Sequence, residues 1–247
     1  MAFINRQTLK NYFKKGGFAT EKHFIDLIDS SVNTVDDGIA KSPEHGLKLS
    51  PIKEKFKLLS FFKRINQEKS DYSFNLDSNN SEGLSINNCN DATIMKFNKS
   101  GNAGINTDNP NYHLEINGTL GVKTRVGLYK SGTVPADGNW HYIISGLDGI
   151  SAFEVVAKAA GKIGKGYYSV AHAIAVKTFG GKKSKHKIRT TTAYYERYLR
   201  GLSFRWTTGE MYNYGLQVKT RTNYGICSET KESFLIKYNI TNLLDDE

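Results

Sequence analysis

The sequence predicts a mainly β protein with a short α-helical N-terminal head and a C-terminal antiparallel β-sandwich of jelly-roll-like type. Three observations lead to this fold class. Apolar residues follow helical spacing only near the N-terminus, and they alternate with polar residues through the second half. Gly, Asn and Asp separate the short apolar runs in between. With 247 residues, of which 38% are hydrophobic and 23% charged, the chain can bury folded cores.

Residues 1–50 are expected to form a helical docking segment. Thr8 is a candidate N-cap for a short first helix, and Thr20 is a candidate N-cap for a second. The second helix should carry a narrow apolar stripe that is buried against another surface, because its apolar residues recur at helical spacing. The stripe consists of Phe24, Leu27, Ile28, Ser31 and Val35. The turn at 36–38 should end this helix.

Residues 51–125 are expected to form a β-rich connector. Short alternating runs, such as Tyr72–Leu76 and Leu84–Ile86, lie between turns rich in Asn and Ser. Within the tract GNAGINTDNPNYHLEINGTLGV at 101–122, the alternating runs are even shorter. Strands of this length do not make a self-sufficient core. We therefore expect the connector to trimerise or to pair its edge strands with another chain.

The same tract resembles the recurring GIGT..P...L.VNGT.GV segments of phage tail fibres and phage-tail-like appendages. The matching positions are Ile105, Thr107, Pro110, Leu114, Ile116, Asn117, Gly118 and Thr119. The resemblance implies a fibrous or multimeric β-assembly. From the residues alone, the alternative is a Gly/Asn-rich β-hairpin connector inside one globular fold.

Residues 126–247 are expected to form the sandwich domain. Apolar and polar residues alternate in Phe153–Ala157, Val170–Val176, Leu202–Trp206, Tyr212–Val218 and Phe234–Ile240. About eight such strands over roughly 120 residues are typical of an antiparallel β-sandwich. His172 lies in one of these runs, and we interpret it as a buried, hydrogen-bonded structural histidine rather than a ligand or base.

Enzymatic function is not expected. The sequence has no Gly-x-Ser-x-Gly elbow, His-Glu-x-x-His helix, P-loop or dinucleotide-binding glycine pattern. The six histidines are dispersed, and Cys89 and Cys227 lie far apart with no partners at metal-ligand spacing. We therefore expect no catalytic residue, no cofactor, no metal and two free thiols.

The localisation expected from the sequence is cytoplasmic synthesis followed by assembly into a particle. No run of eighteen or more apolar residues is present, so membrane insertion is not expected. Residues 1–6 lack the features of a Sec signal peptide. Exit from the cell would then follow a different route, such as lysis or particle release.

A basic cluster is the strongest electrostatic feature. Of the net charge of +10, most lies in residues 126–247, which hold 17 Lys and Arg against 10 Asp and Glu. A hairpin tip and the strand leaving it should carry Lys182, Lys183, Lys185, Lys187 and Arg189. We interpret them as a contact for an acidic partner subunit. A solvated loop is the alternative, as is a nucleic-acid site with Tyr194, Tyr195 and Tyr198 as stacking residues, although nucleic acid is the less favoured partner.

Aromatic residues offer a further possible binding site. Trp140, Tyr212 and Tyr214 are candidate glycan contacts, because Tyr and Trp present flat apolar faces with polar edges. The favoured interpretation places such residues in the core or in subunit interfaces.

Two longer stretches resemble proteins encoded with contractile, phage-tail-like injection particles. The first is LKNYFKKGGFATEKHFIDLIDSSVNTVDDGI at 9–39. The second is the C-terminal half, through Trp140, Phe153–Val156, Arg205–Trp206 and Tyr224–Gly225. The resemblance implies a non-enzymatic structural subunit: a cap, a baseplate accessory or a fibre-like component. Its partners would be copies of itself, as a trimer or ring, and sheath, tube, cap or baseplate proteins. The alternative is a glycan-binding adhesin at a fibre tip.

Overall fold

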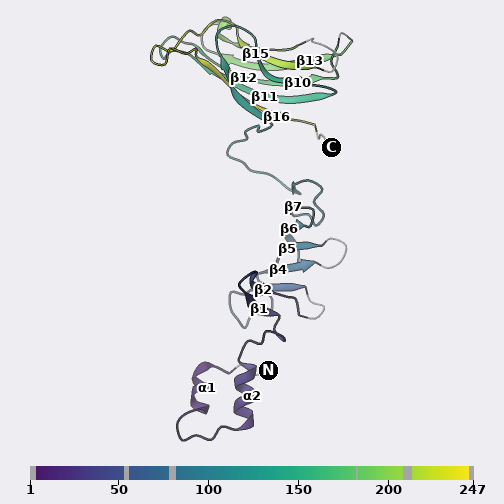
Figure 1. Cartoon of the computed structure of the whole chain (residues 1–247), viewed down its shortest axis with the longest axis vertical. Helices are drawn as coiled ribbons and strands as arrows, with labels where there is room; N and C mark the ends of the chain where they lie inside the picture. Colours follow the sequence, from purple (N-terminus) through teal and green to yellow (C-terminus); the bar gives the residue numbers. More distant parts are fainter. Residues whose placement is uncertain (1–3, 53–55, 78–81, 182, 208–212, 245–247) are drawn as a thin grey trace. The chain divides into compact units, whose positions relative to one another are not determined.

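The computed structural model describes residues 4–52, 56–77, 82–181, 183–207 and 213–244. It is mainly β with a short helical N-terminal part, as the sequence predicts (Figure 1). The chain forms two compact units, Met1–Gly121 and Val122–Glu247. The expected boundary between 125 and 126 lies close to this division. In the described part of the chain, no helix is long and apolar enough to cross a membrane.

Helices α1 (Arg6–Tyr12) and α2 (Glu21–Asp29) pack against each other through aromatic pairs. The rings of Tyr12 and His23 stack at 4.0 Å between centroids, and those of Phe13 and Phe24 meet edge to face at 5.6 Å. The N-cap of α1 is Asn5 rather than the expected Thr8, because the Asn5 Oδ1 accepts the Thr8 amide at 2.9 Å. Thr20 caps α2 as predicted.

Helix α2 is shorter than the helix that the apolar stripe predicts. The hydroxyl of Ser30 donates to the carbonyl of Asp26 at 2.6 Å, and that of Ser31 donates to the carbonyl of Leu27 at 2.9 Å. The Ser30 amide keeps its bond to the Asp26 carbonyl at 3.1 Å, but at Ser31 the hydroxyl takes the place of the amide, which bonds instead to the Ile28 carbonyl at 3.0 Å. The helix therefore ends at Asp29, and Val35 lies beyond it.

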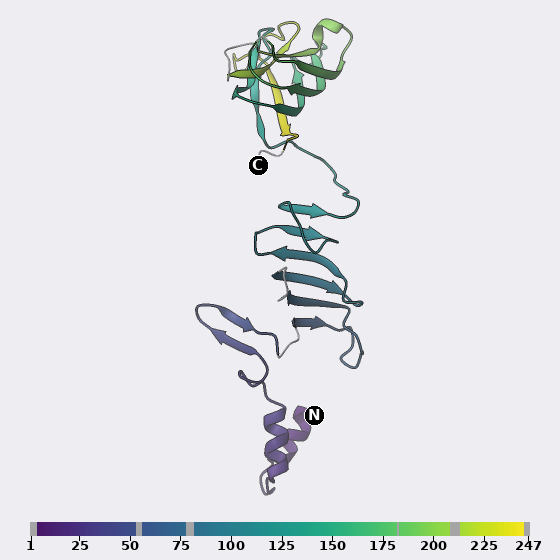
Figure 2. The same cartoon turned by 90° about the vertical axis from the view of Figure 1, so that its right-hand side faces the viewer.

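The remainder of the first unit is a hairpin and a single sheet. The hairpin pairs β1 (Ile39–Ser42) with β2 (Gly46–Leu49). The sheet has six strands in sequence order, a ladder that Figure 2 shows from the side. They are β3 (Lys57–Phe61), β4 (Tyr72–Asp77), β5 (Gly83–Asn88), β6 (Thr93–Asn98), β7 (Ala103–Ile105) and β8 (Leu114–Ile116). All neighbours are antiparallel except β7 and β8, which are parallel.

The 101–122 tract is a hairpin only at its start, where β7 pairs with β6 in the antiparallel sense, because β7 and β8 are parallel. Parallel neighbours need a crossover, and residues 106–113 supply it. The side-chain amides of Asn98 and Asn102 donate to the Pro110 carbonyl at 3.3 and 3.1 Å. These bonds hold the crossover against the turn that precedes β7.

The second unit is an antiparallel β-sandwich of a five-stranded and a three-stranded sheet (Figure 1). The larger sheet has the order β13-β12-β11-β16-β9, and the smaller has the order β10-β15-β14. The strands are β9 (Lys130–Pro135), β10 (His141–Leu147), β11 (Ser151–Ala160), β12 (Tyr168–Lys177), β13 (His186–Tyr194), β14 (Leu202–Trp206), β15 (Tyr214–Thr220) and β16 (Leu235–Asn242).

The sandwich core shows which face of each strand points inward. Phe153, Trp206 and Ile236 are buried, as the alternation predicts. Strand β12 is the exception, because Ala171, Ala173 and Ala175 point into the core. His172 therefore faces outward, and the interpretation of it as a buried histidine is wrong.

Candidate interaction surfaces

The six-stranded sheet of the first unit has one continuous apolar face. The strand register places the apolar residues in rows across the sheet, for example Phe74 opposite Ile86 and Ile86 opposite Met95. The face consists of Leu59, Phe61, Tyr72, Phe74, Leu76, Leu84, Ile86, Met95, Phe97, Ala103, Ile105, Leu114 and Ile116. We call these residues the apolar face.

The opposite face of this sheet is polar and buried. Ser73, Ser85 and Lys96 are 1%, 1% and 2% exposed. The crossover covers part of this side, since Gly104 lies directly beneath Thr107 and Pro110. Antiparallel sheets ordinarily bury their apolar face and expose their polar one. Here the arrangement is inverted.

The apolar face has no cover within the described part of the chain. Its strands make extensive contacts only with their neighbours in the same sheet. Tyr72 and Leu114 are 53% and 58% exposed. Phe61 and Phe97 are 48% and 41% exposed, and an aromatic side chain has on the order of 150–250 Å² to bury in full. Several hundred Å² of contiguous apolar surface is thus left open, near the ~800 Å² that one partner contributes to a standard interface.

The fibre-like motif residues fall into two structural roles. Ile105, Leu114 and Ile116 lie on the apolar face. Thr107 and Pro110 pack on Gly104, where an added Cβ would lie 2.8 Å from the Thr107 carbonyl oxygen. Directly after β8, the backbone amide of Asn117 donates to the Ile105 carbonyl at 3.0 Å. The motif thus builds the parallel end of the sheet.

The predicted docking helix residues are exposed. Phe24, Leu27 and Ile28 are 51%, 38% and 67% accessible, and neither α1 nor α2 has a buried residue. Phe24 has its ring partner in Phe13. Leu27 and Ile28 leave α2 with an open apolar stripe.

The predicted basic hairpin lies between β12 and β13. Lys183 and Lys185 are on the loop, whereas Lys187 and Arg189 are on β13 and point outward from the larger sheet. All four side chains are exposed, and no ion pair involves them in the described residues. Lys182 lies outside the described residues.

The predicted glycan contacts do not form an exposed platform in the described residues. Tyr214 is 2% exposed, and its hydroxyl donates to the Gly149 carbonyl at 2.9 Å. Burial raises the pKa of this phenol. Trp140 is half-buried, and its ring lies 4.4 Å from the Arg205 guanidinium and 4.9 Å from the Lys219 ammonium. Tyr212 lies outside the described residues.

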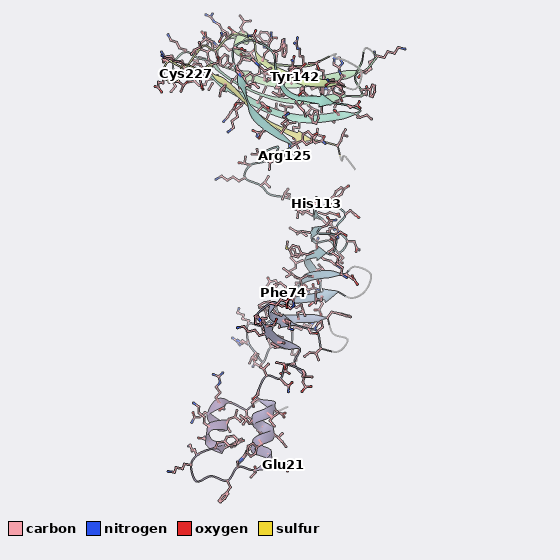
Figure 3. All side chains as sticks on the ribbon, in the orientation of Figure 1. Glu21, Phe74, His113, Arg125, Tyr142 and Cys227 are labelled. Carbon is pink, nitrogen blue, oxygen red and sulfur yellow. The ribbon has the colours of Figure 1, made fainter. Side chains whose placement is uncertain are left out.

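A groove that the sequence does not reveal lies on the larger sheet of the sandwich, at the end near Cys227 (Figure 3). It is open and has a volume of about 880 Å³. Its lining comes from β11, β12, β13, β16 and the loop before β16. Apolar and aromatic side chains predominate, with Lys158 and Lys237 as its basic groups. These residues are far apart in sequence, so no local pattern indicates them.

A second hollow of about 400 Å³ lies on the same sheet and shares Lys158 and Lys237 with the groove. Its other side is the segment 124–127, which includes Arg125 (Figure 3). The Arg125 Nη2 lies 2.7 Å from Glu154 Oε1, and the His172 ring nitrogen lies 2.9 Å from the same oxygen. Glu154 is the carboxylate among the described residues that line this hollow, and it is already paired with two basic groups.

The two cysteines are free thiols. Hydrogen bonds from the backbone amides of Thr230 and Glu229 lower the pKa of the Cys227 thiol. Among the described residues, no group of three or more His, Cys, Asp or Glu side chains could hold a metal ion. The sequence matches no model of a known protein family, and a comparison with curated proteins finds no match.

Proposed function

We propose that this chain is a non-enzymatic structural subunit of a contractile, phage-tail-like injection particle. In this role it serves as a cap, a baseplate accessory or a fibre-like component. The observation that carries the proposal is the inverted six-stranded sheet, which buries Ser73 and Lys96 but exposes its apolar face. An apolar surface of this extent is costly in water and favours assembly.

Copies of the same chain are the partners that this face fits best. It carries no charged side chain, so identical copies can bury one another without enclosing an unpaired charge. Closed rotational symmetry, as in a trimer or ring, brings the same face of every copy to a common axis. The likeness of Ile105–Thr119 to tail-fibre segments supports the same assembly.

Contacts with sheath, tube, cap or baseplate proteins are assigned to two other surfaces. The open stripe of Leu27 and Ile28 suits an apolar groove on a neighbouring protein. The basic hairpin, with Lys183, Lys185 and Lys187, suits an acidic subunit. The helical segment would thus contact the particle through apolar side chains, and the sandwich would contact it through basic side chains.

Fractionation of host lysate by ultracentrifugation tests this function. We expect the chain to sediment with sheath and tube proteins at a fixed ratio. The variant Phe74→Glu/Ile86→Glu places two carboxylates opposite each other on the apolar face, and it should remain in the supernatant.

The matched control is Asn90→Glu/Ser100→Glu, which adds the same charge at exposed turn positions. It should sediment like the unmodified chain. A slowly sedimenting, low-mass peak for the unmodified chain would remove the particle assignment. Circular dichroism of both variants shows whether the β structure is retained.

A further inference from the structure

The groove on the larger sheet has the composition of a ligand site. Tyr168 and Tyr195 line the groove and are 40% and 62% exposed. Val170, the cross-strand neighbour of Lys158 on β12, and Leu235 on β16 add apolar surface beside the basic groups. At about 880 Å³, the groove lies within the range of small-molecule sites, which are mostly apolar with a few placed polar groups.

Two lysines give the groove an excess of positive charge, because its described lining holds two ammonium groups and one carboxylate, that of Glu232. Lys158 on β11 and Lys237 on β16 are direct cross-strand partners, and both are exposed. Like charges in directly opposite positions destabilise a sheet. Among the described residues neither lysine has an ion pair, since Glu154 is bound by Arg125 and His172. The exposed Glu232 also lines the groove, but no ion pair joins it to either lysine.

We infer that this groove binds a saccharide carrying a carboxylate, such as a sialic or uronic acid. The carboxylate lies between the ammonium groups of Lys158 and Lys237, where it relieves their repulsion and accepts charge-assisted hydrogen bonds. The sugar ring packs on the tyrosine faces, and its hydroxyls bond to the polar groups of Thr230 and Ser233 at the rim.

The position of the groove disfavours an acidic peptide as the occupant. Extended peptides gain affinity by adding a strand to a free sheet edge. The groove lies instead on the face of the sheet, where the backbone groups of β11, β12 and β16 are already paired, and the edge strand β13 contributes only Ala193 and Tyr194. Only side chains are offered there, and these suit the hydroxyls and carboxylate of a sugar.

This site does not depend on self-assembly. All of its residues belong to the unit Val122–Glu247, whereas the apolar face belongs to Met1–Gly121. Failure of sugar binding would leave the assembly proposal standing, and the reverse also holds. If both are correct, the copies in one assembly present several groove sites at once, which raises avidity.

The test uses saturation-transfer NMR to measure the binding of N-acetylneuraminic acid and glucuronic acid to the full chain. Neutral N-acetylglucosamine serves for comparison. We expect both acids to bind more tightly than the neutral sugar. Lys158→Gln/Lys237→Gln should weaken the acids about tenfold or more through loss of charge-assisted bonds. The control Lys162→Gln/Lys165→Gln makes the same charge change outside the groove and should leave binding unchanged.

The variant Tyr195→Ala separates the two parts of the site, since it should weaken acidic and neutral sugars alike. Thermal unfolding of each variant shows that the sandwich is intact. Absence of saturable binding by either acid would overturn the inference. An equal loss of affinity for the acids in Lys158→Gln/Lys237→Gln and in Lys162→Gln/Lys165→Gln would overturn it too. Binding of a glutamate-rich peptide through Lys158 and Lys237, in place of the sugars, would assign the groove to a protein partner.

Discussion

Gly104 shows how a single residue determines the end of the connector sheet. It is buried on β7 beneath the crossover, and a Cβ there would lie 2.8 Å from both the Thr107 carbonyl oxygen and its methyl group. Pro110 closes the third side, with its Cβ at 3.4 Å from the same point. The backbone of the crossover must therefore move away if this glycine is replaced.

We predict that Gly104→Ala destabilises the first unit by about 1–3 kcal/mol, the usual cost of overpacking. Gly118→Ala is the matched control, because an added Cβ at Gly118 would meet no atom within 4 Å. The free energy of unfolding of both variants is measured by urea unfolding, monitored by circular dichroism at one fixed protein concentration. Equal midpoints for the two variants would contradict the packing described for Gly104.

At the scale of the element, strand alternation indicated the strands of the sandwich and, with the exception of β12, the face that lies in the core. The run Tyr72–Leu76 does place its apolar residues on one face, as predicted. In β12, however, Val170 and Ile174 share the outer face, and the alanines between them lie in the core. Alternation has a period of two, so it groups residues by face and leaves open which face meets the core.

Packing explains why the alanines of β12, and not its larger side chains, lie in the core. The core around its alanines is filled by large side chains from other strands, namely Phe153 and Tyr238 of the same sheet and Trp206 of the facing sheet. Small side chains on β12 let these rings fit between the sheets at close-packed density. No local signal in β12 carries this information, because the rings come from strands distant in sequence.

The basic hairpin is an element with a predicted contact role. Lys183→Glu/Lys185→Glu/Lys187→Glu should lower incorporation into the particle, because the variant would repel an acidic partner. The sandwich should stay folded, because all three side chains are exposed. Co-sedimentation measures incorporation, and near-ultraviolet circular dichroism checks the fold.

Lys130→Glu/Lys162→Glu/Lys165→Glu is the control for the hairpin variant. It reverses three other exposed lysines of the same unit and changes the net charge equally. Reduced incorporation in both triple variants would point to net charge rather than to a contact. Normal incorporation of the hairpin variant would refute the role assigned to the hairpin.

At the scale of the whole molecule, the chain combines a unit with an open apolar sheet and a unit with a complete core. Sequence reasoning predicted this mainly β organisation, because helical spacing and alternation occupy different parts of the chain. The groove could not be predicted, because Lys158, Tyr195 and Lys237 meet only through the pairing of β11, β12, β13 and β16. The position of Tyr214 in the core, in contrast, agrees with the favoured interpretation of the aromatic residues as core residues.

Self-assembly through the apolar face is the central claim, and light scattering of the purified full chain tests it most directly. The account predicts a mass that is a whole multiple, two or greater, of the 27.7 kDa chain. Phe74→Glu/Ile86→Glu should shift the protein to the single-chain mass, whereas Asn90→Glu/Ser100→Glu should not. A single-chain mass for the unmodified protein at micromolar concentration would contradict the claim.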